Sequence, residues 1–397
     1  MRSGGVVLVL LLLMGAGVGA WWVVQRGGEG AGEARTVQAT LSAAGALAGG
    51  DTAGFARAEG PRPFVFPDDH GPHPEYRTEW WYLTGNLRTE EGRPLGMQLT
   101  FFRNALSPTP ADRDSGWNTN QLWMAHFALT DPDRGLHRTG ERFARGAAGL
   151  AGGTADPFRV WLHDWEIRGI EGSAFPMRLH AAEGDAAITL EIDRGKPPVG
   201  QGVDGWSQKG PEPGNASYYL SWTRMPARGE VRMGGETHRV EGELWMDREW
   251  STSALSEENT GWDWFSIQLD DGRELMVFEL RREDGLRDPH DHGSLVEVDG
   301  SARTLPGEAY TIEVLDRWAS PVDGAEYPSG WRITVPDEGL DLTVTPRMRD
   351  QEMRLSIRYW EGAVVVEGTA DGVPVEGVGY VELTGYAEGD RGRGGGE

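Results

Sequence analysis

The sequence contains no cysteine among its 397 residues. Disulfide bridges, thiolate catalysis, cysteine-ligated zinc and iron–sulfur clusters are therefore excluded, and so is lipid attachment through cysteine. Histidine is also scarce, with 9 residues. Any chemistry must use carboxylates, these few histidines or the faces of aromatic rings.

Positive charge is the second shortage. The chain has 38 Lys and Arg against 62 Asp and Glu, which gives a formal net charge of −24. Nucleic acids and anionic membrane surfaces bind clustered Lys and Arg, so both are excluded as partners. The length predicts two domains or one large β-structure.

Helical periodicity is the third feature that the body of the chain lacks. From Phe64 onward no segment keeps a 3.6-residue apolar period for three turns, and 23 Pro and 58 Gly make long helices improbable. Turn signals separate short β-rich segments, which predicts an all-β sandwich or barrel. The expected strands are Trp80–Thr84, Gly96–Phe102, Leu122–Leu129, Phe158–Ile167, Met177–His180, Ala187–Ile192 and Tyr218–Arg224.

The N-terminus carries the single long apolar run, and it favours an extracytoplasmic location, in the periplasm or at the cell surface. Small residues at Val18–Ala20 resemble a signal-peptide cleavage site, whereas Gly4–Val24 is also long enough to span a bilayer. Residues 1–24 are therefore interpreted as either a cleaved signal peptide or one retained transmembrane anchor. A flexible linker is expected over 25–55, and a Gly/Arg-rich tail over 391–397.

A weak internal duplication indicates two related β-domains. Val240–Asp247 parallels Val375–Glu382, and in both an aromatic residue precedes an acid by two positions. Such a pair shares one face of a strand. Trp80–Tyr82 before Met97 likewise resembles Trp262–Trp264 before Met276. The predicted domains are 56–235 and 236–390.

The 17 tryptophans have two interpretations. Each ring buries roughly 150–250 Å², so they could simply fill a core. Barrels of about eight strands also hold small ligands, in pockets lined by aromatic side chains. The residues proposed on this basis to bind a hydrophobic small molecule are Trp80, Trp81, Tyr82, Trp222, Trp245 and Trp250.

Three polar residues are candidates for catalysis. Asp247 is expected on the same strand face as Trp245; desolvation there would raise its pKa and make it a proton donor near neutral pH. The alternative is an Asp–Arg or Glu–Arg ion pair within Asp247–Glu249 that closes the strand end. Glu79, next to Trp80, is either ion-paired or catalytic. His126, alone in an apolar strand, is either a hydrogen-bonded structural residue or catalytic.

Other kinds of site have weaker support. Loops at 69–73 and 288–292 contain His and Asp, but no third ligand stands at a telling spacing, so surface loops are favoured over a metal site. The sequence has no nucleophile elbow, P-loop or dinucleotide fingerprint. We therefore expect neither a metal nor a cofactor.

Four motifs together resemble one known family. His73–Gly85, Ala125–Asp131, Arg142–Gly146 and Trp245–Ser253 are similar to the hydroxyneurosporene synthase (carotenoid 1,2-hydratase) family and its AttH-like secreted relatives. The similarity runs from about Phe55 to Tyr386. It implies two tandem lipocalin-like (calycin) antiparallel β-barrel domains after the hydrophobic segment. It also implies a hydrophobic ligand and, for the characterised branch, cofactor-independent hydration of a terminal carotenoid alkene.

The resemblance implies a mechanism for Asp247, and the chain also differs from the hydratase branch at two motifs. A protonated carboxyl would donate to an alkene carbon, and tryptophan faces would stabilise the resulting cation until water captures it. The hydratase branch has Tyr in place of Trp245 and carries an upstream His-x-Trp, whereas Tyr219–Trp222 contains no His. The chain is therefore more similar to the AttH-like members.

The sequence thus predicts a secreted or membrane-tethered protein that acts on a carotenoid, another isoprenoid or a lipid. Asp247 would be the acid, with Glu79 and His126 as supporting polar groups. The rival prediction is a non-catalytic carrier that delivers hydrophobic ligands to an envelope ABC transporter. A hydrolase is disfavoured because no nucleophile–base pair is recognisable.

Overall fold

The computed structural model describes residues 52–110, 114–252, 255–256 and 258–387. The predicted segment 1–24, nearly all of the linker and the tail 391–397 lie outside these ranges. Within them, the helical elements are three short 3-10 helices: η1 (Asp68–His70), η2 (Gly307–Ala309) and η3 (Pro336–Glu338). None of these helices has the length and hydropathy needed to cross a bilayer.

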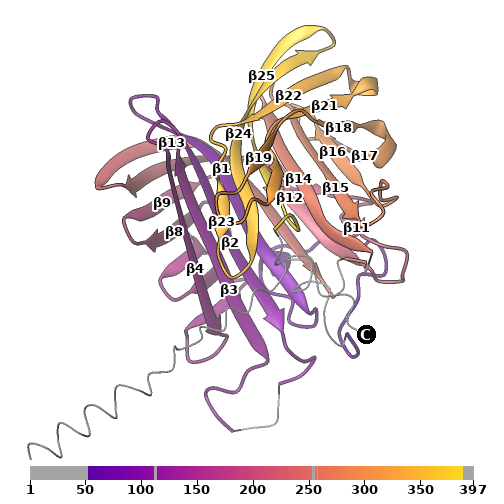
Figure 1. Ribbon diagram of the computed structural model, residues 1–397. Helices are drawn as coiled ribbons and strands as arrows, with labels where there is room; N and C mark the ends of the chain where they lie inside the picture. Colours follow the sequence, from indigo (N-terminus) through magenta and orange to yellow (C-terminus); the bar gives the residue numbers. More distant parts are fainter. Residues whose placement is uncertain (1–51, 111–113, 253–254, 257, 388–397) are drawn as a thin grey trace, which may run out of the picture. The chain divides into compact units, whose positions relative to one another are not determined.

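The first sheet is antiparallel and contains 13 strands (Figure 1). Its order is β4-β3-β2-β1-β13-β12-β9-β8-β7-β6-β5, and β10 and β11 also pair with β12. The strands are β1 (Thr78–Thr89), β2 (Pro94–Ala105), β3 (Gln121–Asp131), β4 (Leu136–Arg145), β5 (Ala151–Thr154), β6 (Arg159–Leu162), β7 (Trp165–Gly169), β8 (Met177–Glu183), β9 (Ala186–Ile192), β10 (Val199–Gly200), β11 (Trp206–Gln208), β12 (Ala216–Met233) and β13 (Glu236–Ser251).

The second sheet contains 10 strands in the order β17-β16-β15-β14-β25-β24-β22-β21-β18, with β23 paired to β24. β19 and β20 form a separate two-stranded sheet. The strands are β14 (Asn259–Leu269), β15 (Glu274–Arg282), β16 (His292–Val296), β17 (Ala302–Pro306), β18 (Thr311–Val314), β19 (Arg317–Ala319), β20 (Glu326–Pro328), β21 (Trp331–Val335), β22 (Leu340–Pro346), β23 (Glu352–Arg354), β24 (Arg358–Ala370) and β25 (Val373–Leu383).

The two sheet orders repeat one plan. β1, β2, β12 and β13 occupy the places that β14, β15, β24 and β25 occupy in the second sheet. The duplicated segments follow this plan, since Val240–Asp247 lies in β13 and Val375–Glu382 in β25. β13 is therefore the closing strand of the first repeat. The predicted domain boundary at residues 235–236 lies at the turn between β12 and β13. The chain passes from the first sheet to the second sheet later, between Ser251 and Asn259.

The alternation of buried and exposed side chains along the strands explains why the first sheet curls around a core. In β9, Ala186, Ile188, Leu190 and Ile192 are buried, while the residues between them are more exposed. This period of two builds one apolar face. The two halves of the sheet meet across that face, where the rings of Phe127 in β3 and Trp165 in β7 lie 5.6 Å apart. The predicted all-β fold with two tandem lipocalin-like antiparallel barrels is confirmed.

The central strands are buried on both faces, unlike β9. Trp81 and Leu83 in β1 belong to the first core, whereas Tyr82 points the opposite way and contacts Trp264 in β14 with ring centroids 5.3 Å apart. On β14, Phe265 belongs to the core of the second sheet. Each of these strands therefore has one side in its own barrel and the other side between the barrels.

Close backbone approach and buried ion pairs join the two sheets. A Cβ on Gly96 of β2 would lie 2.7 Å from the Cβ of Ala363 in β24, so glycine permits this approach. Lys196 and Arg224, from the first repeat, reach the fully buried Glu274 of β15 at 2.9 Å and 2.5 Å. The strands on both sides of the interface are thus held in contact.

The predicted strands are confirmed in position, with one difference. The segment Phe158–Ile167 forms two strands, β6 and β7, instead of one. His163 has a φ of 57°, in the left-handed region, and this residue reverses the chain between Leu162 and Trp165. A tight two-residue turn inside an apolar segment is not visible in the hydrophobic pattern.

Candidate functional site

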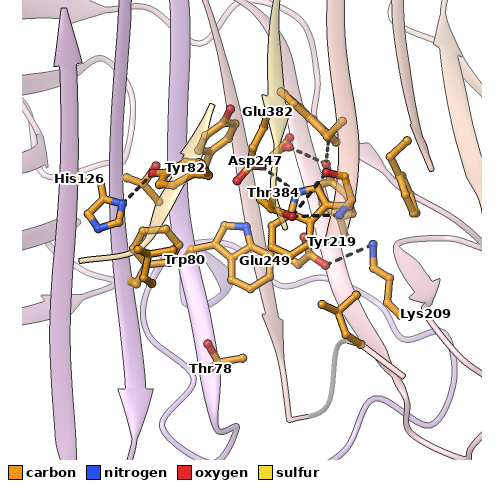
Figure 2. A pocket seen from close by; sticks show the side chains of 18 of the residues that line it. Thr78, Trp80, Tyr82, His126, Lys209, Tyr219, Asp247, Glu249, Glu382 and Thr384 are labelled. Atoms are coloured by element: carbon orange, nitrogen blue, oxygen red, sulfur yellow. Dashed lines mark hydrogen bonds and ion pairs between the residues drawn. The ribbon is translucent and has the colours of Figure 1, made fainter. Parts of the chain in front are cut away.

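A pocket lies between the two sheets, outside both barrel cores (Figure 2). Its cavity volume is about 120 Å³. Pockets that enclose a drug-sized ligand usually measure roughly 300–1,000 Å³, so this one encloses only part of a larger molecule. It is lined by Thr78, Trp80, Tyr82, Thr100, Phe102, Asn104, Met124, His126, Lys209, Tyr219, Asp247, Glu249, Leu255, Trp262, Trp264, Phe278, Leu280, Ile357, Tyr359, Glu382 and Thr384.

Half-buried side chains mark the side of the pocket that faces solvent. Trp80, Phe102, Asn104, Trp262 and Glu382 are each partly exposed, whereas most of the remaining lining is buried. The mouth is therefore mainly aromatic, with one carboxyl group. A long apolar molecule can enter by one end while its remainder lies against these rings.

Asp247, on β13, is the most deeply placed acid in the wall. Its side chain shares a strand face with Trp245, whose Nε1 donates a hydrogen bond of 2.6 Å to Oδ1. The hydroxyl of Ser221 donates to the same oxygen at 2.6 Å, and the hydroxyl of Tyr219 donates to Oδ2 at 2.5 Å. Burial raises the pKa of Asp247 to about 7, against the lowering effect of these three hydrogen bonds. Asp247 is 3% exposed, so its carboxyl is almost completely removed from water.

The neighbouring Arg248 does not pair with Asp247. Successive strand residues point to opposite faces, and Arg248 points to the first core. There its guanidinium donates to the carboxylate of Glu79 at 2.5 Å and lies over the ring of Trp81 at 3.8 Å. Of the two sequence interpretations for Asp247, the structure shows the desolvated carboxyl next to aromatic rings.

Glu79, and not Asp247, is the acid that forms an ion pair with Arg248. It is fully buried and binds both Arg103 and Arg248, and the backbone N–H of His73 donates to it at 2.9 Å. Burial alone would raise its pKa, but the two arginine charges and the His73 hydrogen bond hold that pKa well below the usual range. Glu79 does not line the pocket and stays ionised, so its position is that of a structural anion.

A buried ion pair lies on another side of the pocket (Figure 2). The ammonium of Lys209 is 3.7 Å from Glu249 and lies over the ring of Phe278 at 4.2 Å. Ser217 also donates a hydrogen bond to Glu249. Burial lowers the pKa of Lys209 and raises that of Glu249, so this environment disfavours both charges. The pair is neutral as a whole.

The second sheet contributes its own acids. Glu382 on β25 accepts a hydrogen bond of 3.1 Å from Trp262 Nε1, and burial raises its pKa to about 7. Glu361 on β24 is fully buried; its pKa is raised well above the usual range by burial, and the hydroxyl of Tyr82 donates to it at 2.9 Å. Carboxyl groups of both repeats therefore meet around one pocket.

His126, on β3, connects the pocket to the protein surface. Its Nδ1 is 2.7 Å from the hydroxyl of Tyr359, and its Nε2 is 3.0 Å from Glu141. Burial alone would raise the pKa of Glu141, but hydrogen bonds from His126 and Ser356 lower it. His126 is thus hydrogen-bonded at both nitrogens and also lines the pocket, while its catalytic role stays a prediction.

The proposed aromatic residues divide into two groups. Trp80 and Tyr82 line the pocket, and Trp245 lies behind Asp247. Trp81, Trp222 and Trp250 belong to the core of the first sheet. Odd-numbered and even-numbered residues of one strand point to opposite faces, one toward the barrel core and the other toward the pocket. Adjacent tryptophans therefore do not line the same surface.

The histidine loops hold their acids in local pairs. Asp69 contacts His73 at 3.0 Å, and Asp288 contacts His290 at 2.9 Å. Within the described ranges, no three His, Asp or Glu side chains converge as metal ligands.

Sequence reasoning missed several lining residues. Glu382 had a signal, because Tyr380-x-Glu382 repeats the Trp245-x-Asp247 pattern. Trp262 and Trp264 were aligned with Trp80–Tyr82 but were not assigned to a site. Lys209 stands in a turn-like segment, and Tyr219 and Tyr359 lie in ordinary strands, so no local pattern indicated them.

Comparisons with known proteins agree with this architecture. The AttH-like family matches residues 57–386. A candidate AttH from Nitrosomonas europaea is 35% identical, with a TM-score of 0.73, over 84% of this chain and 100% of that one. None of the curated proteins matches the sequence.

Two further crystal structures share the fold at low sequence identity. Kievitone hydratase from Nectria haematococca is 14% identical, with a TM-score of 0.64, over 85% of this chain and 99% of that one. CghA, crystallised with Sch210972, is 15% identical, with a TM-score of 0.51, over 86% and 98% of the two chains. At these identities the likeness concerns the fold alone.

Proposed function

The chain belongs to the AttH-like family, and we propose that its pocket adds water to an alkene of a long apolar ligand, an isoprenoid such as a carotenoid or a similar lipid. The observation that carries this proposal is the carboxyl of Asp247. It is buried among aromatic rings, has a pKa raised to about 7 by that burial, and faces the cavity. A group with these properties can hold a proton in a dry site and release it to carbon.

The reaction proceeds in two steps. The Asp247 carboxyl donates its proton to the less substituted carbon of a trisubstituted alkene, and the positive charge forms on the tertiary carbon. The faces of Trp80 and Trp264 line the same cavity and stabilise that charge through their ring quadrupoles. Water then forms the new C–O bond and loses a proton, so that alkene and water give a tertiary alcohol.

The charges of the pocket favour a neutral ligand. Asp247, Glu249 and Glu382 all line it, while the single lining cation among the described residues, Lys209, is paired with Glu249. A ligand carboxylate would meet this excess of acidic groups without a free cation, which is unfavourable. A hydrocarbon end matches the aromatic wall better than the head of a fatty acid.

The test compares the wild-type protein with Asp247→Asn. Lycopene and squalene, both with terminal trisubstituted alkenes, are supplied in detergent, and the water adduct is measured by mass spectrometry. Quenching of tryptophan fluorescence measures binding separately. We expect Asp247→Asn to bind both probes and to lose at least about 100-fold in hydration rate, the usual contribution of a general acid. Unchanged hydration would refute the role of Asp247.

A matched control separates loss of chemistry from loss of folding. Glu376 lies on β25 and is exposed, so Glu376→Gln also replaces an acid by an amide but does so away from the pocket. This variant should hydrate the probes at the wild-type rate. A fall in both variants would indicate a general effect of lost negative charge.

A non-catalytic carrier is the second candidate, and the half-exposed aromatic mouth favours it. Trp80, Phe102 and Trp262 can hold an apolar chain without any reaction. In this case wild type and Asp247→Asn would bind the probes equally and convert neither. Delivery to an envelope ABC transporter belongs to this alternative as a prediction, and a location outside the cytoplasm stays a prediction for both candidate functions.

A further inference from the structure

The duplicated strands bring two acids to one pocket. Asp247 follows Trp245 on β13, and Glu382 follows Tyr380 on β25, at equivalent places in the two repeats. Both carboxyl groups line the cavity, and they approach from different sheets (Figure 2). An aromatic-x-acid pattern that appears in the sequence as mere repetition therefore produces a pair of acids around one ligand site.

The two acids have different surroundings. Asp247 is almost completely buried and accepts hydrogen bonds from Ser221, Tyr219 and Trp245. Glu382 is half-buried at the mouth and, within the described part of the chain, accepts one side-chain hydrogen bond, from Trp262. Glu382 is therefore the more exposed of these two acids in the pocket wall.

Their ionisation is coupled. Burial raises the pKa of each acid to about 7, and the charge of Asp247 raises that of Glu382 further. Of the two carboxyl groups, that of Asp247 is the more deeply buried and that of Glu382 the more exposed, so the first is assigned the role of acid and the second that of base.

The other acids near the pocket are engaged elsewhere. Glu249 is paired with Lys209 and accepts a hydrogen bond from Ser217. Glu361 is fully buried and holds the hydroxyl of Tyr82, and it is not part of the pocket lining. Glu382 is the remaining carboxylate that faces both the cavity and the mouth.

We infer that Glu382 is the catalytic base that activates the attacking water, and that Asp247 is the acid. This inference rests on the proposed hydration. Glu382 accepts one proton from water as the water oxygen forms its bond to the tertiary cation, and the product is the neutral alcohol. Asp247 has lost one proton and Glu382 has gained one, so transfer from Glu382 to Asp247 through water restores the starting state. No oxidant, reductant or metal is required.

An experiment in D₂O separates protonation of the alkene from the attack of water on the cation. In D₂O, a cation formed by Asp247 has two fates: capture by water gives the alcohol, and loss of a proton returns an alkene that carries deuterium. We expect Glu382→Gln to reduce alcohol formation from squalene at least about 100-fold, while deuterium still enters recovered squalene at a rate within a few-fold of wild type. Asp247→Asn should lose both, and Glu376→Gln should lose neither.

The results distinguish failure of the proposed hydration from failure of the role of Glu382. If wild type forms no alcohol and incorporates no deuterium, the proposed hydration fails, and the role of Glu382 fails with it. If wild type is active and Glu382→Gln either keeps full alcohol formation or loses both reactions equally, only the inference about Glu382 is overturned.

Chemical rescue provides a second variant. Glu382→Ala removes the carboxylate and leaves space near the mouth for a small anion. Added formate should restore part of the alcohol formation in this variant and should not change the Asp247→Asn protein. Absence of rescue in a folded Glu382→Ala protein that still incorporates deuterium would contradict a base at this position.

Discussion

At the scale of single residues, the carboxyl of Asp247 links function to stability. Its pKa is raised from 3.8 to about 7 by burial in the folded protein. Between these values the folded state binds more protons than the unfolded state, so the stabilising contribution is fully present below about pH 4 and is lost as the pH rises to about 7. The same desolvation that would make Asp247 a proton donor in the proposed hydration therefore destabilises the fold at neutral and alkaline pH.

Asp247→Asn is therefore expected to stabilise the protein at high pH. The change in pKa corresponds to at most roughly 4 kcal/mol, at about 1.4 kcal/mol for each pKa unit. We expect the variant to exceed wild type in unfolding free energy by on the order of 2–4 kcal/mol at pH 8 and by much less at pH 4.5. Urea unfolding at the two pH values measures the difference, and equal pH dependence of both proteins would contradict it.

Glu79 illustrates the opposite case, an acid whose partners keep it charged. Glu79→Gln would leave Arg103 and Arg248 buried with reduced pairing, and breaking such a pair usually costs about 3–5 kcal/mol. We expect a loss of this size in urea unfolding, because the role of Glu79 is structural. Full stability with lost hydration activity would instead show that Glu79 takes part in catalysis.

At the scale of elements, strand β1 separates core from pocket by the alternation of its side chains. Trp81 is fully buried in the first core, whereas its neighbour Trp80 is half-buried at the pocket mouth. The two residues are identical in chemistry and adjacent in sequence. The face of the strand alone therefore places one of them in the core and the other in the pocket wall.

Paired substitutions test this division. Trp81→Ala should lower the unfolding free energy by about 3–5 kcal/mol, the usual effect of a large cavity in a core. Trp80→Ala should lower it clearly less and should weaken the binding of squalene, measured by titration with fluorescence detection. Equal destabilisation by both variants, with equal binding, would contradict the assignment of the two faces.

Element-scale patterns also show how much the sequence could predict. Alternation and turn signals predicted the strands, and the aromatic-x-acid repeat predicted that Trp245 and Asp247 share a face, as the hydrogen bond between them confirms. The pattern could not show which face of β1, or of the second half of β13, lies inside the barrel, because both faces are buried and both carry aromatic residues. The sequence-based prediction therefore groups Trp81 and Trp250, and likewise Trp222 of β12, with the pocket although they lie in the core.

At the scale of the whole molecule, the site exists only where the two sheets meet. The hydroxyl of Tyr82 reaches Glu361, a residue 279 positions away, and Trp264 Nε1 donates to the hydroxyl of Tyr219 at 3.0 Å. Contacts of this range leave no trace in local sequence, which explains why Tyr219, Tyr359 and Lys209 were not anticipated. The packing of the two sheets against each other places acids from both around one pocket.

The central claim is that an apolar ligand binds between the two sheets with a reactive end at Asp247. A crystal structure of the full chain carrying Asp247→Asn, grown with squalene, tests this claim most directly. The account predicts electron density for a terminal alkene against residue 247, between Trp80 and Trp264, with the remaining chain leaving past Glu382. Squalene enclosed inside the core of either barrel, with the pocket between the sheets empty, would contradict it.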